Sequence, residues 1–236
     1  MAWRITADPE RYQEALDWFL KKTHVPADIA KELEARATRR AFWVSGAGEL
    51  RLYSDVFDEI EHALANGTSL GEFKKAVKAK LEAAWAGSVK NPGHRVELIY
   101  RNNVQAAYAA GRWHQLQHPA LVKYRPFLMY DAVLDARTSE ICQACNKTTL
   151  PRDDPWWDGH TPPLHHACRS SVRALTKRQG ERQGVTGSPP TIDGEVVAAQ
   201  DGFGATPTDI EWQPQADQYP PALWREFENK TQDAPA

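Results

Sequence analysis

The sequence predicts an α+β protein that is mainly α, with a helical region at 1–120, a small α+β module at 121–178 and a weakly ordered acidic extension at 179–236. Apolar residues recur at helical spacing through the first half, and the pattern changes after Pro119 to short alternation and a proline-rich loop. Cysteines and histidines gather in pairs beside that loop. With 42% hydrophobic and 25% charged residues, the composition is that of a globular protein, which excludes disorder of the whole chain.

Two helices are expected first. Asp8-Pro9-Glu10 combines an N-cap residue, a proline suited to the first helical position and an early acid. The apolar residues that follow lie at helical spacing: Tyr12, Leu16, Phe19 and Leu20. A second helix is predicted from Ala27 to about Trp43, and the flexible segment 45–48 ends it.

The next two segments predict an antiparallel helical hairpin. The first has one apolar stripe, closed by Asn66-Gly67 as a helix C-cap would close it: Leu50, Tyr53, Val56, Phe57, Ile60 and Leu64. Ser69 and Glu72 then form a capping box. The second stripe keeps the same period: Leu70, Phe73, Val77, Leu81 and Trp85.

A longer helix is predicted from about Arg95 to Gln117, after the turn at 91–93. Asn102 and Asn103 lie inside it, although asparagine is a poor helix former. Two interpretations stay open for this pair: a contact surface, or side chains that face solvent.

Beyond Pro119 we expect little regular structure. Short alternation of β-formers predicts a strand over 127–136. Proline and glycine leave no room for a long element in the loop at 150–163. Trp156 and Trp157 in this loop either stack on a ligand or, as tryptophans beside prolines more often do, pin the loop to the core. Farther on, a short helix is expected around 222–230.

All three cysteines lie between residues 142 and 168. Two residues separate Cys142 from Cys145, and two separate His165 from Cys168. An odd number of cysteines disfavours a disulfide framework, whereas two such pairs match the ligand spacing of tetrahedral zinc. Because three thiolates and one imidazole close the coordination shell, we expect a structural zinc that ties the loop to the core. The module is therefore predicted to be zinc-stapled.

Other assignments of these side chains stay open. His166 is the alternative to His165 as the ligand, and His160 is expected on solvent. The alternative to a zinc site is that the cysteines are small buried apolar residues and the histidines ordinary polar groups, but two matched pairs favour zinc.

Catalysis is disfavoured in this region. A metal-dependent nuclease would draw on its acids, arginine and histidines: Asp135, Arg137, Asp158, His160, His165 and His166. Asp135 and Arg137 lie two residues apart after the strand, so we expect them to stabilise a turn. Cys142 as a nucleophile is disfavoured because a second cysteine nearby favours metal ligation.

The charge is distributed unevenly along the chain. The segment 191–236 has nine acids against Arg225 and Lys230, so it carries −7 and the remainder +5, within a total of −2. A DNA-binding module would use the basic residues before this segment: Arg169, Arg173, Lys177, Arg178 and Arg182. No apolar run is long enough for a membrane span and no signal peptide is evident, so we expect no membrane association and a cytoplasmic start.

Several motifs follow one another in a fixed order between residues 50 and 176. They are Leu-Ala-Asn-Gly-Thr-Ser-Leu-Gly-Glu-Phe at 64–73, the helical segment 95–112, Asp-Ala-Arg-Thr at 135–138, Cys142, Asp-Pro-Trp-Trp-Asp-Gly-His at 154–160 and Pro-Pro-Leu-His-His-Ala-Cys-Arg at 162–169. In this combination the chain resembles the phage Mu F-like head morphogenesis family, the minor head proteins of tailed bacteriophages. The resemblance covers roughly half of the chain.

This resemblance implies a low-copy minor capsid protein that associates with the portal protein and other capsid proteins at the portal vertex during procapsid assembly. It implies an effect on DNA packaging or ejection. The expected location is the host cytoplasm during assembly and then the virion, in the capsid interior or at the portal vertex. No enzymatic mechanism comes with the resemblance, so we expect no enzyme.

The resemblance also maps family positions onto this chain, at Asp135, Arg137, Cys142, His165 and Cys168. Many members end this region in Cys-Arg-Cys, whereas this chain reads Cys168-Arg169-Ser170. Cys145 would then have to complete the metal shell. Two functions of other classes stay open: a metal-dependent nuclease, and a DNA-binding module that uses the Cys/His region and the adjacent basic segment.

Overall fold

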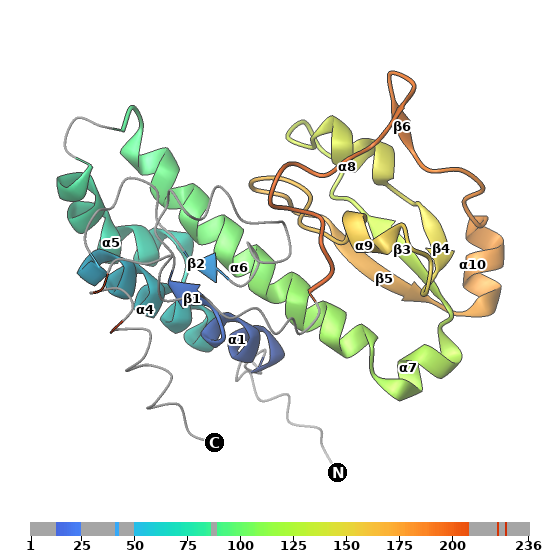
Figure 1. Cartoon of the computed structure of the whole chain (residues 1–236), viewed down its shortest axis with the longest axis horizontal. Coiled ribbons are helices and arrows are strands. Elements are labelled where there is room, and N and C mark those ends of the chain that lie inside the picture. The colour runs from blue at the N-terminus through green and yellow to red at the C-terminus, as the bar shows by residue number, and fades with distance from the viewer. Residues whose placement is uncertain are drawn as a thin grey trace, which may run out of the picture.

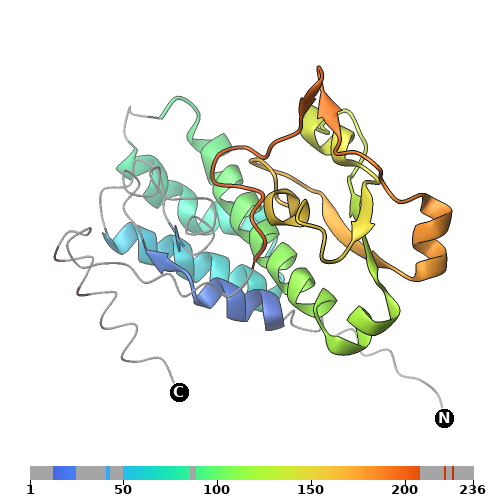
Figure 2. The ribbon, with the colours of Figure 1, turned by 45° about the vertical axis from the view of Figure 1, so that its right-hand side comes forward.

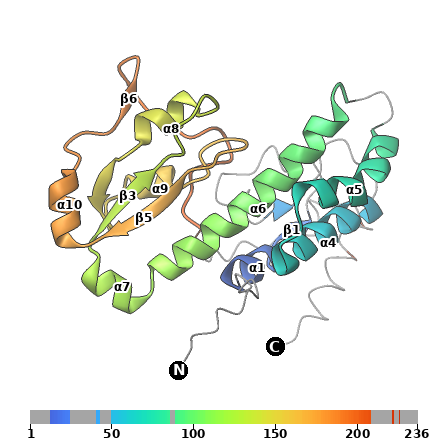
Figure 3. The same cartoon turned by 180° about the vertical axis from the view of Figure 1, so that it is seen from behind.

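One long helix joins a helical part and an α+β part in the computed structural model, which describes residues 13–24, 41–42, 50–85, 89–207, 221 and 225 (Figure 1). This helix, α6 (Pro92–Leu116), runs along both parts, as the view from behind also shows (Figure 3). The protein is mainly helical with a small sheet region, which confirms the predicted α+β class. In the ranges described, no helix has the length and apolar character needed to cross a membrane.

The helical part packs α1 (Gln13–Leu20), α4 (Leu50–Asn66) and α5 (Leu70–Ala84) against α6. Aromatic rings fill its centre: Phe19 stacks on Phe57 with ring centroids 4.5 Å apart, and Phe42 meets Phe57 edge-on at 5.1 Å. Burial of these large apolar groups is the main stabilising contribution in this core.

The predicted hairpin of α4 and α5 is confirmed. Val56 and Ile60 of the first stripe and Phe73 of the second are buried. The capping box begins α5, since Ser69 Oγ accepts from the Glu72 amide at 3.3 Å and Glu72 Oε2 accepts from the Ser69 amide at 2.9 Å. Gly67, with φ 70°, ends α4 in the left-handed conformation that glycine adopts without strain.

The second predicted helix is wrong at the residues that can be checked. Ala41–Phe42 form β2, which pairs in parallel with β1 (Thr23–His24), while 27–40 and Trp43 lie outside the described residues. Phe42 is 1% exposed, so its contact with the neighbouring phenylalanines outweighs the local helical pattern. The expected helix start at 8–12 also lies outside the described residues.

Helix α6 starts three residues before its predicted start. Asn91 Oδ1 accepts from the His94 amide at 3.1 Å, and a proline occupies the first turn. The N-terminal part of α6 buries Val96 and Ala107 in the helical core, whereas Trp113 and Leu116 belong to the core of the α+β part. A short helix, α7 (Pro119–Tyr124), follows.

The α+β part is built on an antiparallel sheet of order β4–β3–β5. Its strands are β3 (Phe127–Asp131), β4 (Thr149–Pro151) and β5 (Ser171–Leu175). On β3, Leu128 and Tyr130 face the core, and Met129 pairs with Arg173 of β5. The strand ends at 131 rather than 136, because β5 begins at Ser171, opposite Asp131, and the Ala132 amide donates to the Asn146 side chain instead of a strand.

Two short helices complete this core: α8 (Glu140–Cys145) and α9 (Trp157–His160). Trp157 is 1% exposed and donates through Nε1 to the Pro151 carbonyl at 3.0 Å. This tryptophan pins its loop to the core, as expected.

Residues 179–207 are not the weakly ordered extension that the sequence predicts. They hold most of α10 (Lys177–Gln183) and the hairpin of β6 (Thr191–Ile192) and β7 (Glu195–Val196), and the chain then returns over α9 toward α6 (Figure 2). Backbone hydrogen bonds join this return to the module, among them Gln200 N to the Leu164 carbonyl at 2.8 Å. Of residues 208–236, including the helix expected at 222–230, only 221 and 225 are described.

Candidate metal centre

Three soft or borderline ligand atoms converge beneath α8. Cys142 Sγ lies 3.1 Å from His165 Nε2 and 3.7 Å from Cys168 Sγ. All three ligand atoms lie within 4.8 Å of one another, and both cysteines are buried. Among the residues that the structure describes, this is the group of His, Cys, Asp and Glu side chains able to hold a metal ion.

Short-range hydrogen bonds at the start of α8 and in the facing loop position these three atoms. Ser139 is the N-cap of α8 and accepts from the Cys142 amide at 3.2 Å, which sets the first turn of the helix. On the facing loop, the Cys168 amide donates to the His165 carbonyl at 3.2 Å, and Ala167 has φ 56°. This tight turn directs His165 and Cys168 toward the same point.

Hydrogen bonding fixes the orientation of the His165 ring. Nδ1 lies 2.8 Å from the His166 carbonyl, which can only accept, so Nδ1 carries the hydrogen. Nε2 then faces Cys142 and the Ser139 hydroxyl, which is 2.7 Å away. A backbone carbonyl that holds one ring nitrogen while the other binds metal is the usual support of a histidine ligand.

The spacing of these atoms suits zinc. Tetrahedral zinc with bonds of about 2.3 Å to sulfur separates two thiolates by about 3.8 Å, close to the 3.7 Å between Cys142 and Cys168. The Cys142–His165 separation of 3.1 Å is shorter than the separation of about 3.5 Å in such a shell. A short separation fits a thiolate and an imidazole that share a proton.

The three groups also shift one another's pKa values. The hydrogen bond from Cys168 lowers the pKa of Cys142, and the bond with His165 lowers it further against the effect of burial. The pKa of Cys168 is raised by its bond to Cys142 and by burial. The pKa of His165 is raised by the Cys142 thiolate. A metal ion would replace these shared protons, so its binding would release them.

The structure does not bring Cys145 into this group. Spacing predicts a tight turn with both cysteines facing inward, but the segment is a helix, and three residues advance the chain about 4.5 Å along a helix axis. Cys145 is 0% exposed within the apolar core, and burial raises its pKa to about 12. Among the described residues, three candidate ligands thus meet at one point instead of the closed shell of four that the spacing predicts, and the Ser139 hydroxyl or a water would have to supply the fourth.

Asn102 on α6 holds the ligand loop from outside and was not recognised as a site residue. Its Oδ1 accepts from the Ala167 amide at 2.8 Å, and its Nδ2 lies 2.8 Å from His166 Nδ1. His166 is therefore engaged with Asn102 rather than with the cysteines. The only sequence signal was a poor helix former inside a helix. Asn103, by contrast, bonds the Ile99 carbonyl of its own helix at 2.9 Å.

The Asp135 turn is confirmed and has a partner that sequence reasoning missed. The Arg137 amide donates to Asp135 Oδ1 at 2.8 Å, as expected for a turn. Arg169, next to Cys168, donates to both oxygens of Asp135 at 2.6 and 2.7 Å. This guanidinium holds the pKa of Asp135 well below its usual range. The turn is therefore fastened to the ligand loop.

The residues of a nuclease are not assembled within the described part of the chain. Asp135 is engaged with Arg169, and Asp158 is exposed and outside the cluster. His160 is half-buried rather than on solvent: its ring stacks on Trp156 at 4.2 Å, and its nitrogens lie 2.8 and 2.7 Å from the carbonyls of Trp156 and Val197. No acid of the described ranges joins Cys142, His165 and Cys168.

Fold and site together define a protein with a helical part and a small Cys/His-bearing α+β part that share one helix. Residues 54–173, from α4 to β5, match the family described as Phage Mu protein F like protein. This segment includes all three cluster residues. The chain belongs to this family, which confirms the resemblance seen in its motifs.

Curated relatives extend the match. The chain is 29% identical over 187 residues to the Putative capsid assembly protein F of Escherichia phage Mu, which covers 73% of this chain and 42% of that protein. It is 32% identical over 176 residues to the Mu-like prophage FluMu F protein of Haemophilus influenzae, covering 70% of this chain and 41% of that protein. The chain thus spans about two fifths of the length of these relatives. No solved structure matches it significantly.

Proposed function

We propose that this chain works in phage head assembly as a minor capsid protein. The observation that carries the proposal is membership of the Mu F-like family together with similarity to a protein named for capsid assembly. Support for a role in contacts rather than turnover comes from the cluster of Cys142, His165 and Cys168, which no acid joins in the described residues.

Its partners in this proposal are the portal protein and other capsid proteins. The protein joins the portal vertex during procapsid assembly in the host cytoplasm and stays in the virion, where it affects DNA packaging or ejection. The helical part is the docking element in this proposal, since its helices pack into one core that holds their outer faces in a fixed arrangement.

The metal in this proposal is a structural zinc held by Cys142, His165 and Cys168. Its support is the donor set and its spacing. Zinc bound there would crosslink α8, a helix of six residues, to the loop before β5 and so hold two short segments together.

The proposal is tested by assembling heads with and without the protein. We expect coexpression with the portal protein to yield a complex that survives size-exclusion chromatography, and phage that lack the protein to form heads with reduced infectivity. Phage of normal head composition and full infectivity in its absence would contradict the proposal.

The competing nuclease function is tested separately, and the assembly role predicts no cleavage. Purified protein loaded with zinc, or supplied with magnesium, should leave plasmid DNA intact. Cleavage that disappears in Cys142→Ala and persists in Cys145→Ala would replace the assembly role with an enzymatic one.

A further inference from the structure

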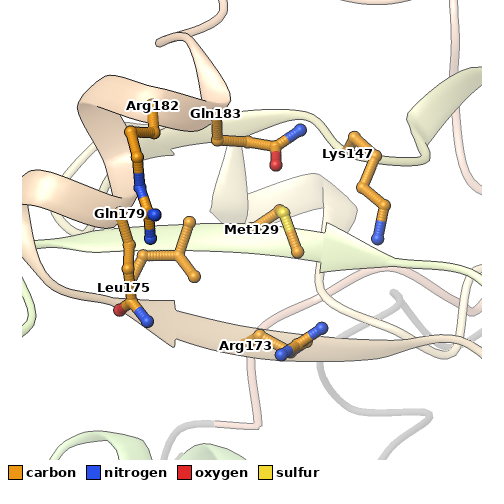
Figure 4. Close-up of a pocket in the computed structure, with 7 residues that line it drawn as sticks. All are labelled: Met129, Lys147, Arg173, Leu175, Gln179, Arg182 and Gln183. Atoms are coloured by element: carbon orange, nitrogen blue, oxygen red, sulfur yellow. The ribbon is translucent and has the colours of Figure 1, made fainter.

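The outer face of the sheet carries a basic pocket that the metal centre does not use. Met129 and Leu175 form its floor on β3 and β5, on the face opposite the buried Leu128 and Tyr130. Figure 4 shows cationic side chains on several sides of Met129. The complete lining is Met129, Lys147, Arg173, Leu175, Gln179, Arg182 and Gln183, with no acid among them.

Positive charge is in excess at this pocket. Asp131 accepts from Lys147 at 2.8 Å and lies 3.6 Å from an Arg173 nitrogen, so one carboxylate serves two cations. Arg182 has no hydrogen-bond or ionic partner in the described part of the chain. Arg173 and Lys147 keep 55% and 45% of their side chains exposed. Two positive charges thus remain available to a ligand.

Neutral donors surround the same space. Gln179 uses its Oε1 to accept from the Thr176 amide, which leaves its Nε2 hydrogens for a ligand. Gln183 adds a second amide at the rim. Guanidinium, ammonium and amide donors around an apolar floor suit an anion with several oxygens, and the planar fork of arginine matches phosphate.

We propose that this pocket binds the phosphodiester backbone of DNA without sequence preference. The cations continue along α10, where Lys177 and Arg178 are exposed, so a polymer with regularly spaced phosphates can contact the pocket and the helix at once. The inference deepens the proposed function in one respect, because an assembled head encloses DNA. Binding to naked duplex needs no head, so the two proposals fail independently.

The test is fluorescence anisotropy of a short labelled duplex with the full chain over a series of NaCl concentrations. If the two available charges of the pocket and the two exposed cations of α10 each displace one counterion, log K should fall against log salt with a slope of about −4. Arg173→Ala with Arg182→Ala should weaken binding about tenfold and reduce the magnitude of the slope by about 2. Arg182→Gln alone should reduce it by about 1 and, because Arg182 has no partner in the described chain, leave the melting temperature unchanged.

The matched control removes the same charge elsewhere. Lys75→Ala with Lys78→Ala changes two exposed cations of α5 and should leave both affinity and slope unchanged. Equal weakening by both double variants would overturn the pocket as the site, as would a wild-type chain that does not bind duplex. A polyglutamate peptide that binds more tightly than DNA of equal charge, and depends on Arg182, would reassign the pocket to carboxylates and overturn the proposal.

Discussion

At the residue scale, spacing identified three of the four candidate ligands and missed the distant residues that hold their loop and the neighbouring turn in place. Cys142, His165 and Cys168 were predicted, and the structure brings them together. Cys145 was predicted on the assumption of a turn where the chain forms a helix. Asn102 and Arg169 form hydrogen bonds with residues more than thirty positions away in the sequence. Local sequence patterns do not predict contacts at that separation.

Two cysteines three residues apart allow a direct test of the ligand set. Cys142→Ala should abolish zinc binding, because it removes the thiolate that contacts both other ligands. At a free zinc concentration about a thousandfold above Kd, this costs about 4 kcal/mol of stability. Cys145→Ala should keep about one zinc per chain. Elemental mass spectrometry and melting curves with and without chelator measure both effects, and zinc loss in Cys145→Ala would make that residue a ligand.

Neighbouring asparagines give a second matched pair. Asn102→Ala removes two hydrogen bonds to the ligand loop, so it should destabilise the protein by about 1–2 kcal/mol and weaken zinc binding about tenfold. Asn103→Ala loses one bond within its own helix and gains helix propensity, so both quantities should stay nearly unchanged. Urea unfolding and competitive zinc titration supply the measurements. Equal effects of the two variants would mean that Asn102 does not position the loop.

At the element scale, periodicity predicted the long helices and failed for the short pieces. The hairpin of α4 and α5 follows from two apolar stripes and a capping box. The two-residue strands β1 and β2 are too short to show alternation. Residues 184–207 are ordered by backbone hydrogen bonds to distant segments, such as Thr186 N to the Thr149 carbonyl at 2.8 Å. Apolar periodicity therefore does not predict their structure.

Two helical glycines should respond oppositely to the same substitution. A Cβ at Gly180 on α10 would lie 2.5 Å from the Phe127 ring, so Gly180→Ala should destabilise the protein by about 1–3 kcal/mol. Gly71 on α5 has open space around it apart from Ser69 Oγ at 3.8 Å, so Gly71→Ala should stabilise it by about 0.5–1 kcal/mol. Thermal unfolding of both variants measures these two changes in stability. A stabilising Gly180→Ala would show that α10 does not pack on β3.

At the scale of the whole molecule, the boundaries predicted at 120 and 178 do not coincide with the two cores. The last turns of α6 belong to the α+β core, and α10 spans the second boundary. Composition placed the second boundary at 178, before the glycine- and proline-containing segment that leads into the acidic residues, but order depends on contacts, and Val197 and Ala205 are each 4% exposed.

Two truncated chains test whether the packed segment 191–207 stabilises the fold. A chain that ends after residue 207 keeps the described contacts of 179–207 and serves as the reference. A chain that ends after 190 loses the buried Val197 and the backbone bonds of Gln200 and Gly204, and should be less stable by about 3 kcal/mol. Differential scanning calorimetry compares the two. Equal stability would mean that the return adds nothing to the fold.

Helix α6 also has a mechanical consequence. Its 25 residues span about 37 Å and enter both cores without a break. A continuous helix packed in this way transmits a tilt at one end to the other end, because bending the helix would disrupt packed side chains in both cores. A partner that binds the first helices of this protein therefore sets the orientation of the sheet and of its basic face.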